Sequence, residues 1–395
     1  MSTPHPGREA HCRRAIVCDR LFDGRRWHEP AAVLIEDGRI HGIARPVEVP
    51  DNWPQTRLTK GALLTPGFID LQVNGGGGML LNDSPTADTM RAIAHAHRRY
   101  GTTACLPTMI TDSRDQMRLA IEAARGASGR DGVLGVHLEG PFISPARPGV
   151  HRRDFIVQAT NRDLEWLLGL AEPGRSVVTL APECVPAGFV KRLAAAGISV
   201  SLGHSEASAE TIRVAADDGL TGVTHLFNAM PAMAARLPGP VGAALADRRL
   251  TASLIVDGIH VDPVAIRAAF AAKGAERIAL VTDAMPTVGA AVTQFSLMGR
   301  VITLARGRLV DAEDTLAGAH LDMASAVRTA VTLVHVPLED ALRSASLTPA
   351  EFLGLDHERG ALFPGARADL VALTPDLVPL ATWIDGQEEP SDNDH

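Results

Sequence analysis

The amino-acid sequence predicts an α/β protein: a (β/α)8 TIM barrel with a small β-sandwich domain built from both ends of the chain. Eight short apolar runs alternate with helix-like stretches through the middle of the 395 residues, and both ends carry only strand-like segments. The chain is also long enough to bury one large core beside a smaller one. We expect residues 1–60 to begin the small β domain, 61–355 to form the barrel, and 356–395 to complete the β domain and add a polar tail.

The eight apolar runs have the length of buried parallel strands, about five to seven residues each. They cover residues 67–72, 102–106, 133–139, 177–181, 198–202, 222–226, 253–257 and 277–282. Stretches with helix-like composition lie between them, among them 87–99, 114–124, 208–218 and 263–273. Eight strands separated by helices are typical of a closed barrel, whereas a doubly wound open sheet, the alternative, usually needs fewer strands.

The two ends of the chain have short β-type segments instead. Residues 15–17, 32–36 and 39–43 lie near the start, and 368–373 and 381–384 lie near the end. Asp37-Gly38 is a typical hairpin turn. Because neither group is large enough to fold by itself, we expect the two groups to pair. The tail at 391–395 is polar and is expected to be disordered.

Composition limits the partners that this protein can have. A formal net charge of −8 disfavours nucleic acid, although a small phosphorylated ligand needs only one or two local cations. The four cysteines are scattered, which argues against disulfides or a cysteine zinc site and fits a reducing cytosol. Residues 1–14 lack the apolar region of a secretory signal, and no apolar run reaches the length of a membrane span. We therefore expect a soluble cytoplasmic protein without a nucleic-acid or membrane partner.

Ionisable residues follow several of the predicted strands, at the end of a barrel where active sites lie. Glu139 ends the third strand, His204 and His225 end the fifth and sixth, and Asp283 follows the eighth. One carboxylate and two imidazoles can hold a zinc-like ion with one position left open. A water molecule in that position has a pKa of roughly 7, and Asp283 would stand beside it as a base.

Other polar residues have simpler interpretations. A lone strand-end histidine is more often structural, and it is the combination of four ionisable strand ends that favours a site. His137 is expected in the core, and His95 and His97 on a solvated helix surface. The glycines at 75–78 lack the lysine of a phosphate-binding loop, which favours a turn near the site.

Six segments together resemble the N-acetylglucosamine-6-phosphate deacetylase family of the amidohydrolase superfamily. They are 66–75 (PGFIDLQVNG), 137–142 (HLEGPF), 202–205 (LGHS), 224–231 (THLFNAMP), 257–260 (DGIH) and 281–285 (VTDAM). Each segment is a weak signal alone, but the set occurs in the family's order, and the likeness extends to about residues 15–387.

The resemblance implies metal-dependent hydrolysis of the acetamide of N-acetyl-D-glucosamine 6-phosphate to D-glucosamine 6-phosphate and acetate, in amino-sugar catabolism. It implies Glu139, His204 and His225 as metal ligands, and Asp283 and His151 as catalytic residues, with His151 near the acetamido carbonyl. It also implies a homodimer in which Arg236 or His260 reaches the neighbouring site. The implied substrate-binding residues are Val150, His151, Asn228, Ala229, Arg236, His260, Leu316, Ala317 and Gly318.

Two positions bear on the number of metal ions. Many superfamily members carry a His-x-His pair after the first strand and bind two ions, whereas this chain has Gln72 and Asn74, as in a single-metal branch. Amides are poor ligands for zinc. We therefore expect one divalent ion per subunit, Zn2+ first, with Fe2+, Co2+ or Mn2+ also possible.

One departure from the family pattern and three rival functions remain. Leu237 replaces the glutamate that often follows the family's equivalent of Arg236. An N-acetylgalactosamine-6-phosphate deacetylase would share almost every motif. A cyclic amidase would share the barrel but usually has the His-x-His pair, and a non-catalytic scaffold would not need the intact ligand positions.

Overall fold

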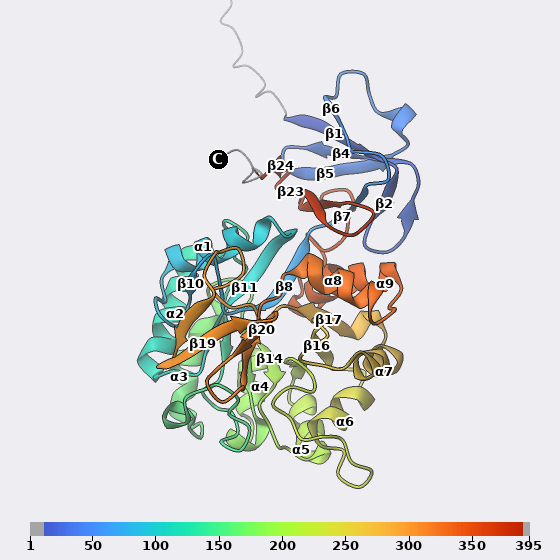
Figure 1. Ribbon diagram of the computed structural model, residues 1–395. Helices are drawn as coiled ribbons and strands as arrows, with labels where there is room; N and C mark the ends of the chain where they lie inside the picture. Colours follow the sequence, from blue (N-terminus) through green and yellow to red (C-terminus); the bar gives the residue numbers. More distant parts are fainter. Residues whose placement is uncertain (1–11, 390–395) are drawn as a thin grey trace, which may run out of the picture.

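The computed structural model describes residues 12–389, so the tail at 391–395 and most of the polar N-terminal segment lie outside the described residues. Figure 1 shows a barrel surrounded by helices and, above it, a layered β region to which both ends of the chain contribute. Among residues 12–389, none of the helices has the length and apolar composition of a membrane span.

Eight parallel strands form the barrel sheet in the order β17-β16-β15-β14-β13-β12-β11-β8. Each overlaps one of the predicted apolar runs, so the predicted (β/α)8 architecture is confirmed. Their bounds are β8 Phe68–Val73, β11 Thr102–Ile110, β12 His137–Glu139, β13 Val177–Leu180, β14 Ser199–Leu202, β15 Leu220–Val223, β16 Thr251–Ile255 and β17 Ile278–Val281.

Helices cover the outside of this sheet. They are α1 Ala87–Arg98, α2 Arg114–Ala127, α3 Leu164–Leu167, α4 Phe189–Ala195, α5 Ala209–Asp217, α6 Gly239–Ala246, α7 Pro263–Lys273, α8 Met323–Thr332, α9 Leu338–Ala345 and α10 Leu347–Leu353. Side chains before several helices accept a hydrogen bond from the first turn, which satisfies a backbone donor that the helix cannot. Thr86 does so for α1, Ser113 for α2 and Asp262 for α7.

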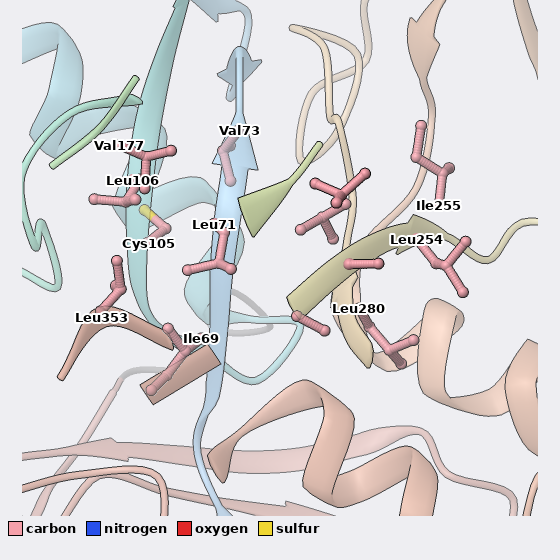
Figure 2. Packing of buried hydrophobic residues seen from close by; sticks show 14 of the residues in the cluster. Ile69, Leu71, Val73, Cys105, Leu106, Val177, Leu254, Ile255, Leu280 and Leu353 are labelled. Atoms are coloured by element: carbon pink, nitrogen blue, oxygen red, sulfur yellow. The ribbon is translucent and has the colours of Figure 1, made fainter. Parts of the chain in front are cut away.

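Burial of apolar side chains holds the barrel together. Figure 2 shows Ile69, Leu71, Leu106, Leu254 and Leu280 among the packed side chains of the large core, which joins the strands to the helices around them. Burying one such side chain stabilises the fold by about 1.5–3 kcal/mol. The strand ends that carry the polar residues are therefore held in fixed positions.

The prediction for His97 is wrong. Its position on α1 lies in the same stripe as the buried Met90, Ile93 and Ala94, and its side chain is fully buried. Nε2 contacts the carbonyl oxygen of Gly75 at 3.0 Å. Helical spacing decided burial here, whereas the polar character of histidine had suggested a surface position. His95 is exposed, as expected.

The barrel closes between its first and last strands. The hydroxyl of Thr282 donates to Asp70 Oδ2 at 2.5 Å, and the amide of Asp283 donates to the carbonyl oxygen of Gln72 at 3.0 Å. A parallel bridge joins Val73 to Ala284 just beyond. Burial raises the pKa of Asp70 to about 7. This seam places Asp283 directly beside the residues that follow β8.

The β region consists of two packed sheets. One has the order β5-β4-β1-β6 and the other β24-β23-β22-β7-β2-β3. Their bounds are β1 Arg13–Cys18, β4 Ala31–Glu36, β5 Arg39–Ala44 and β6 Gln55–Arg57, then β2 Arg20–Phe22, β3 Trp27–His28, β7 Leu63–Pro66, β22 Leu370–Leu373, β23 Pro379–Ile384 and β24 Gln387–Glu388. Ile16 and Val33 of the first sheet share an apolar cluster with Leu64 and Trp383 of the second.

The two ends of the chain meet where β22 pairs with β7 in antiparallel fashion. Asp37 and Gly38 connect β4 to β5 with φ of 50° and 77°, the conformation of a tight hairpin turn. The predicted β-sandwich built from both ends is thus confirmed, while the division at residues 60 and 355 stays a prediction.

A further sheet, which is antiparallel throughout and which we term the flap sheet, follows the barrel strands. It contains β18 Gln294–Leu297, β19 Arg300–Ala305, β20 Arg308–Val310 and β21 Leu316–Ala319. Leu297, Ile302, Leu309 and Ala317 of this sheet pack against Leu80, Ile110, Val150 and Met285. The sequence did not predict this sheet. A short hairpin, β9 Gly75–Gly76 and β10 Met79–Leu80, lies where a turn was expected.

Candidate active site

Glu139, His204 and His225 converge at the carboxyl ends of β12, β14 and β15. Glu139 Oε1 lies 3.0 Å from His204 Nε2 and 2.7 Å from His225 Nε2, and the two nitrogens are 3.2 Å apart. Ligand atoms bonded to a tetrahedral zinc ion lie about 3.3 Å from one another. The three side chains are therefore spaced to form one face of such a coordination shell, with only a small expansion.

A neighbouring carbonyl group orients the first imidazole. His204 Nδ1 lies 2.8 Å from the carbonyl oxygen of Arg147, which can only accept a hydrogen bond. The proton of a neutral ring is thus on Nδ1, and Nε2 has a free lone pair directed at the cluster. No hydrogen-bond partner for His225 Nδ1 is found among the described residues.

The charges in the cluster stabilise one another. Burial favours a high pKa for Glu139, but the close contacts with His204 and His225 hold it well below its usual range. Burial favours a low pKa for His225, yet the contact with Glu139 raises it. A carboxylate that draws a proton onto an adjacent imidazole in this way also attracts a divalent cation.

His204, His225 and Asp283 have a backbone conformation that is rare outside glycine. The φ angles are 48° at His204, 33° at His225 and 51° at Asp283. Such left-handed residues cost roughly 1–3 kcal/mol each, and they concentrate at functional sites. Each follows closely on a barrel strand, so the strained residue turns its side chain over the end of the barrel.

Asp283 is held by two side-chain amides at the carboxyl end of β8. Asn74 Nδ2 donates to Asp283 Oδ1 at 2.6 Å, and Gln72 Nε2 donates to the same oxygen at 3.1 Å. Gln72 Nε2 also lies 3.1 Å from Glu139 Oε2. Within the described part of the chain, Asp283 Oδ2 has no hydrogen-bond partner. Burial, together with the charge of Glu139, raises the pKa of Asp283 to about 6.

His151 borders the same cluster. Its Nε2 lies 3.9 Å from Glu139 Oε2, and one ligand atom each from Glu139, His151 and His204 fall within 4.8 Å of one another. The amide of Thr111 donates to His151 Nδ1 at 3.3 Å, and the Thr111 hydroxyl is 2.8 Å from the same atom. Burial, followed by the charge of His204, lowers the pKa of His151 to about 3. A neutral ring that accepts at Nδ1 carries its proton on Nε2, so it suits hydrogen-bond donation better than metal ligation.

His137 lies in the barrel interior, as expected. Its Nε2 is 2.7 Å from Thr179 Oγ1, and burial lowers its pKa to about 4.

A cavity of about 400 Å³ opens from the cluster toward the flap sheet. Its walls include most of the substrate-binding residues that the resemblance implied: Val150, His151, Asn228, Ala229, His260, Leu316 and Gly318. Gln72 is buried behind Asp283, and Ala317 packs within the apolar face of the flap sheet. His260 Nδ1 is 2.6 Å from Asp257 Oδ2.

The structure does not bring Arg236 into this cavity. The residue is exposed on a turn closed by hydrogen bonds between Ala234 and Leu237. Met233 and Leu237, its apolar neighbours, are 59% and 78% exposed. A single chain therefore places this arginine at the surface, in a setting typical of a contact with another molecule.

Sequence reasoning missed several wall residues. Ile110 and Met285 contribute apolar surface, and Arg308, Asp314 and Thr315 contribute polar groups from the flap sheet and its loop. Ile110 ends β11 and Met285 lies two residues after Asp283, so their place near the barrel rim could have indicated them. No sequence signal identified the three flap residues, because the sheet that carries them was not expected.

Comparison with known proteins gives a consistent picture. The chain matches the model of the amidohydrolase family over residues 63–388. It is 43% identical to an N-acetylgalactosamine-6-phosphate deacetylase of Shewanella sp. (strain ANA-3), with 91% of each chain covered. It is 35% identical to an N-acetylglucosamine-6-phosphate deacetylase of Haemophilus influenzae, with 90% of this chain and 94% of that protein covered.

Solved structures agree with these relatives. The N-acetylglucosamine-6-phosphate deacetylase of Pasteurella multocida superimposes with a TM-score of 0.92 at 33% identity, over 96% of this chain and 100% of the other. The Mycobacterium smegmatis enzyme, an aspartate-to-alanine mutant in complex with N-acetyl-D-glucosamine 6-phosphate, has a TM-score of 0.87 at 31% identity, over 95% and 99% of the two chains.

Proposed function

This chain belongs to the amidohydrolase family, and from that premise we propose that it hydrolyses the acetamide of N-acetyl-D-glucosamine 6-phosphate to D-glucosamine 6-phosphate and acetate, in the cytoplasm. The observation that carries the proposal is the convergence of three metal-type ligands, a half-buried aspartate and a neutral histidine in the wall of one cavity. The names of the relatives supply the substrate class.

Glu139, His204 and His225 would hold one divalent ion per subunit, with Zn2+ expected before Fe2+, Co2+ or Mn2+. An ion bound there would polarise the amide carbonyl and lower the pKa of a coordinated water molecule to about 7. The amide nitrogens of Gln72 and Asn74 donate to Glu139 and Asp283, and an N–H donor cannot bind a cation, which supports a single ion.

Side chains of the protein then transfer the proton of the water molecule and stabilise the negative charge on the acetyl oxygen. Asp283 Oδ2, which is free toward the cavity, accepts the proton of the attacking water and returns it to the departing amine. His151 Nε2–H donates to the acetyl oxygen as negative charge develops on it, a contribution of roughly 3 kcal/mol. Gln72 and Asn74 keep Asp283 Oδ1 occupied, so only Oδ2 takes part.

Recognition of the sugar phosphate falls to the other residues of the cavity wall. These include Asn228, Ala229 and His260, together with Leu316 and Gly318 of the flap sheet. Arg236, exposed between apolar neighbours, would enter the cavity of a second subunit in a homodimer. Contacts to the phosphate fix the acetamide relative to Asp283 and thereby lower the barrier.

The test is acetate release by the metal-loaded protein from N-acetyl-D-glucosamine 6-phosphate. N-acetyl-D-galactosamine 6-phosphate is the second candidate, favoured by the 43% identity to the Shewanella enzyme. We expect kcat/KM for the glucosamine substrate to exceed that for its epimer, and both to exceed that for the unphosphorylated sugars. A higher value for the epimer would reassign the substrate, and no acetate from either phosphate would refute the proposal.

A further inference from the structure

Arg308 is a charged residue in the cavity to which the proposed mechanism gives no role. Among the described residues that line the cavity, it is the only lysine or arginine. A guanidinium group is the side chain best suited to bind a phosphate dianion, because its planar N–H groups can donate two parallel hydrogen bonds. Arg236 has the same chemistry but is exposed outside this cavity.

The flap sheet brings Arg308 to the end of the cavity where His260 lies. Arg308 follows the tight turn that joins β19 to β20, in which Arg306 and Gly307 have φ of 54° and 79°. A Cβ atom added at Gly307 would lie 4.0 Å from Cδ1 of Ile259, the residue immediately before His260. The turn before β20 therefore lies beside the loop that carries His260, and both Arg308 and His260 line the cavity.

The present partner of Arg308 holds it weakly. Nη1 is 3.3 Å from Asp314 Oδ1 and Nη2 is 3.4 Å from Asp314 Oδ2, both long for a charged hydrogen bond. The two side chains are 40% and 72% exposed, and pairs so exposed contribute little to stability. Stabilisation of the fold therefore does not explain why the Arg308–Asp314 pair lies at the cavity wall.

Asp314 is itself presented by a well-defined loop. Asp311 Oδ1 accepts hydrogen bonds from the amides of Glu313 and Thr315, and Arg300 contacts Asp311 Oδ2 at 3.1 Å. The loop therefore keeps a carboxylate beside Arg308 that an incoming dianion can replace.

We propose that Arg308 binds the 6-phosphate of the substrate that occupies the cavity of its own subunit. The phosphate replaces Asp314 as the partner of Arg308, and the flap sheet moves toward the cavity as the substrate binds. The inference rests on the proposed function, because it takes the phosphorylated sugar as the ligand. It makes Arg308 a specificity-determining residue for phosphate that lies in the same chain as the metal-type ligands.

Steady-state kinetics of the metal-loaded enzyme tests the proposal with two substrates, the N-acetylhexosamine 6-phosphate and the same sugar without phosphate. Arg308→Gln should raise KM for the phosphorylated sugar by about 10-fold or more, the loss expected for a charge-assisted hydrogen bond. Its kcat, and kcat/KM for the unphosphorylated sugar, should change little. Inhibition by inorganic phosphate should weaken in parallel. Arg306→Gln, an exposed neighbour in the turn, is the matched control.

Asp314→Asn separates exchange from a structural ion pair. If Asp314 competes with the phosphate, this variant should lower KM for the phosphorylated sugar and strengthen phosphate inhibition. The proposal would be overturned if Asp314→Asn raised KM for the phosphorylated sugar as Arg308→Gln is expected to do. It would also be overturned if Arg308→Gln lowered kcat/KM equally for the phosphorylated and unphosphorylated sugars. A wild-type enzyme inactive on every phosphorylated sugar would refute the proposed function as well, whereas an active wild type with an unaffected Arg308→Gln variant would refute this inference alone.

Discussion

Glu139, His204 and His225 are at most 5% exposed and lie at the ends of barrel strands, whereas Arg236 and Arg308 lie on a surface turn and at the start of a short flap strand. The proposed reactive end of the site is thus held by the core of the barrel, and the arginines of its proposed recognition end lie on exposed or half-exposed segments. The difference implies that the chemistry is fixed by the fold, while the choice of sugar phosphate can change through the loops.

The largest effect should come from removing a metal-type ligand. His204→Ala should lose bound metal and activity together, by more than about 100-fold, because even residues that only support metal ligands cost about 10–100-fold when changed. Elemental analysis and acetate release on one preparation measure both. His95→Ala, on an exposed face of α1, is the control. Full metal retention in His204→Ala would remove this residue from the ligand set.

Asp283→Asn should separate proton transfer from folding at the same end. The asparagine keeps the shape of the side chain but cannot accept a proton, so kcat should fall by at least ~10²-fold. Metal content and KM should change little, since the ligands and the phosphate contacts lie elsewhere. Near-normal kcat would point to His151 as the group that moves the proton, and loss of metal would make Asp283 a ligand.

Arg236→Ala should act at the recognition end instead. KM for the phosphorylated sugar should rise by about 10-fold or more, with unchanged metal content. Arg248→Ala, another exposed arginine, is the control.

Co-expression of Arg236→Ala with Asp283→Asn sharpens this test. In a hybrid dimer, Arg236 of the Asp283→Asn chain would enter the site of the Arg236→Ala chain, which retains Asp283. This site should regain part of the activity. No recovery in confirmed hybrids, or full activity of a monomer, would contradict a shared site.

The smallest effect should follow from loss of one hydroxyl behind His151. Thr111→Val keeps the amide that donates to Nδ1 but removes the hydroxyl 2.8 Å away, so kcat should fall by about 2–10-fold at constant KM. Thr111→Ser, which retains the hydroxyl, should recover the wild-type rate. Equal losses in both variants would mean that packing of the threonine methyl group matters instead.

The reactive end could be predicted from sequence because its signals are local. A buried strand is visible as an apolar run, and Glu139, His204 and Asp283 lie where such runs end. The flap sheet gave no comparable signal, since β18 and β19 are half exposed and short. His97 was misplaced because the polarity of one residue was weighed above its helical spacing. The surface position of Arg236 could not be predicted either, because residue spacing does not show how a turn lies relative to a cavity.

The seam between β8 and β17 links the proposed base to the completion of the fold. The amide of Asp283 donates to Gln72 across the junction where the first and last strands meet. Barrel closure brings together residues 211 positions apart in the sequence, so the base and its amide partners come into register only when the whole sheet has assembled. Exchange of the Asp283 amide proton with solvent would therefore report transient opening of the entire ring, and a chain that loosens at this junction would lose its base before it loses its ligands.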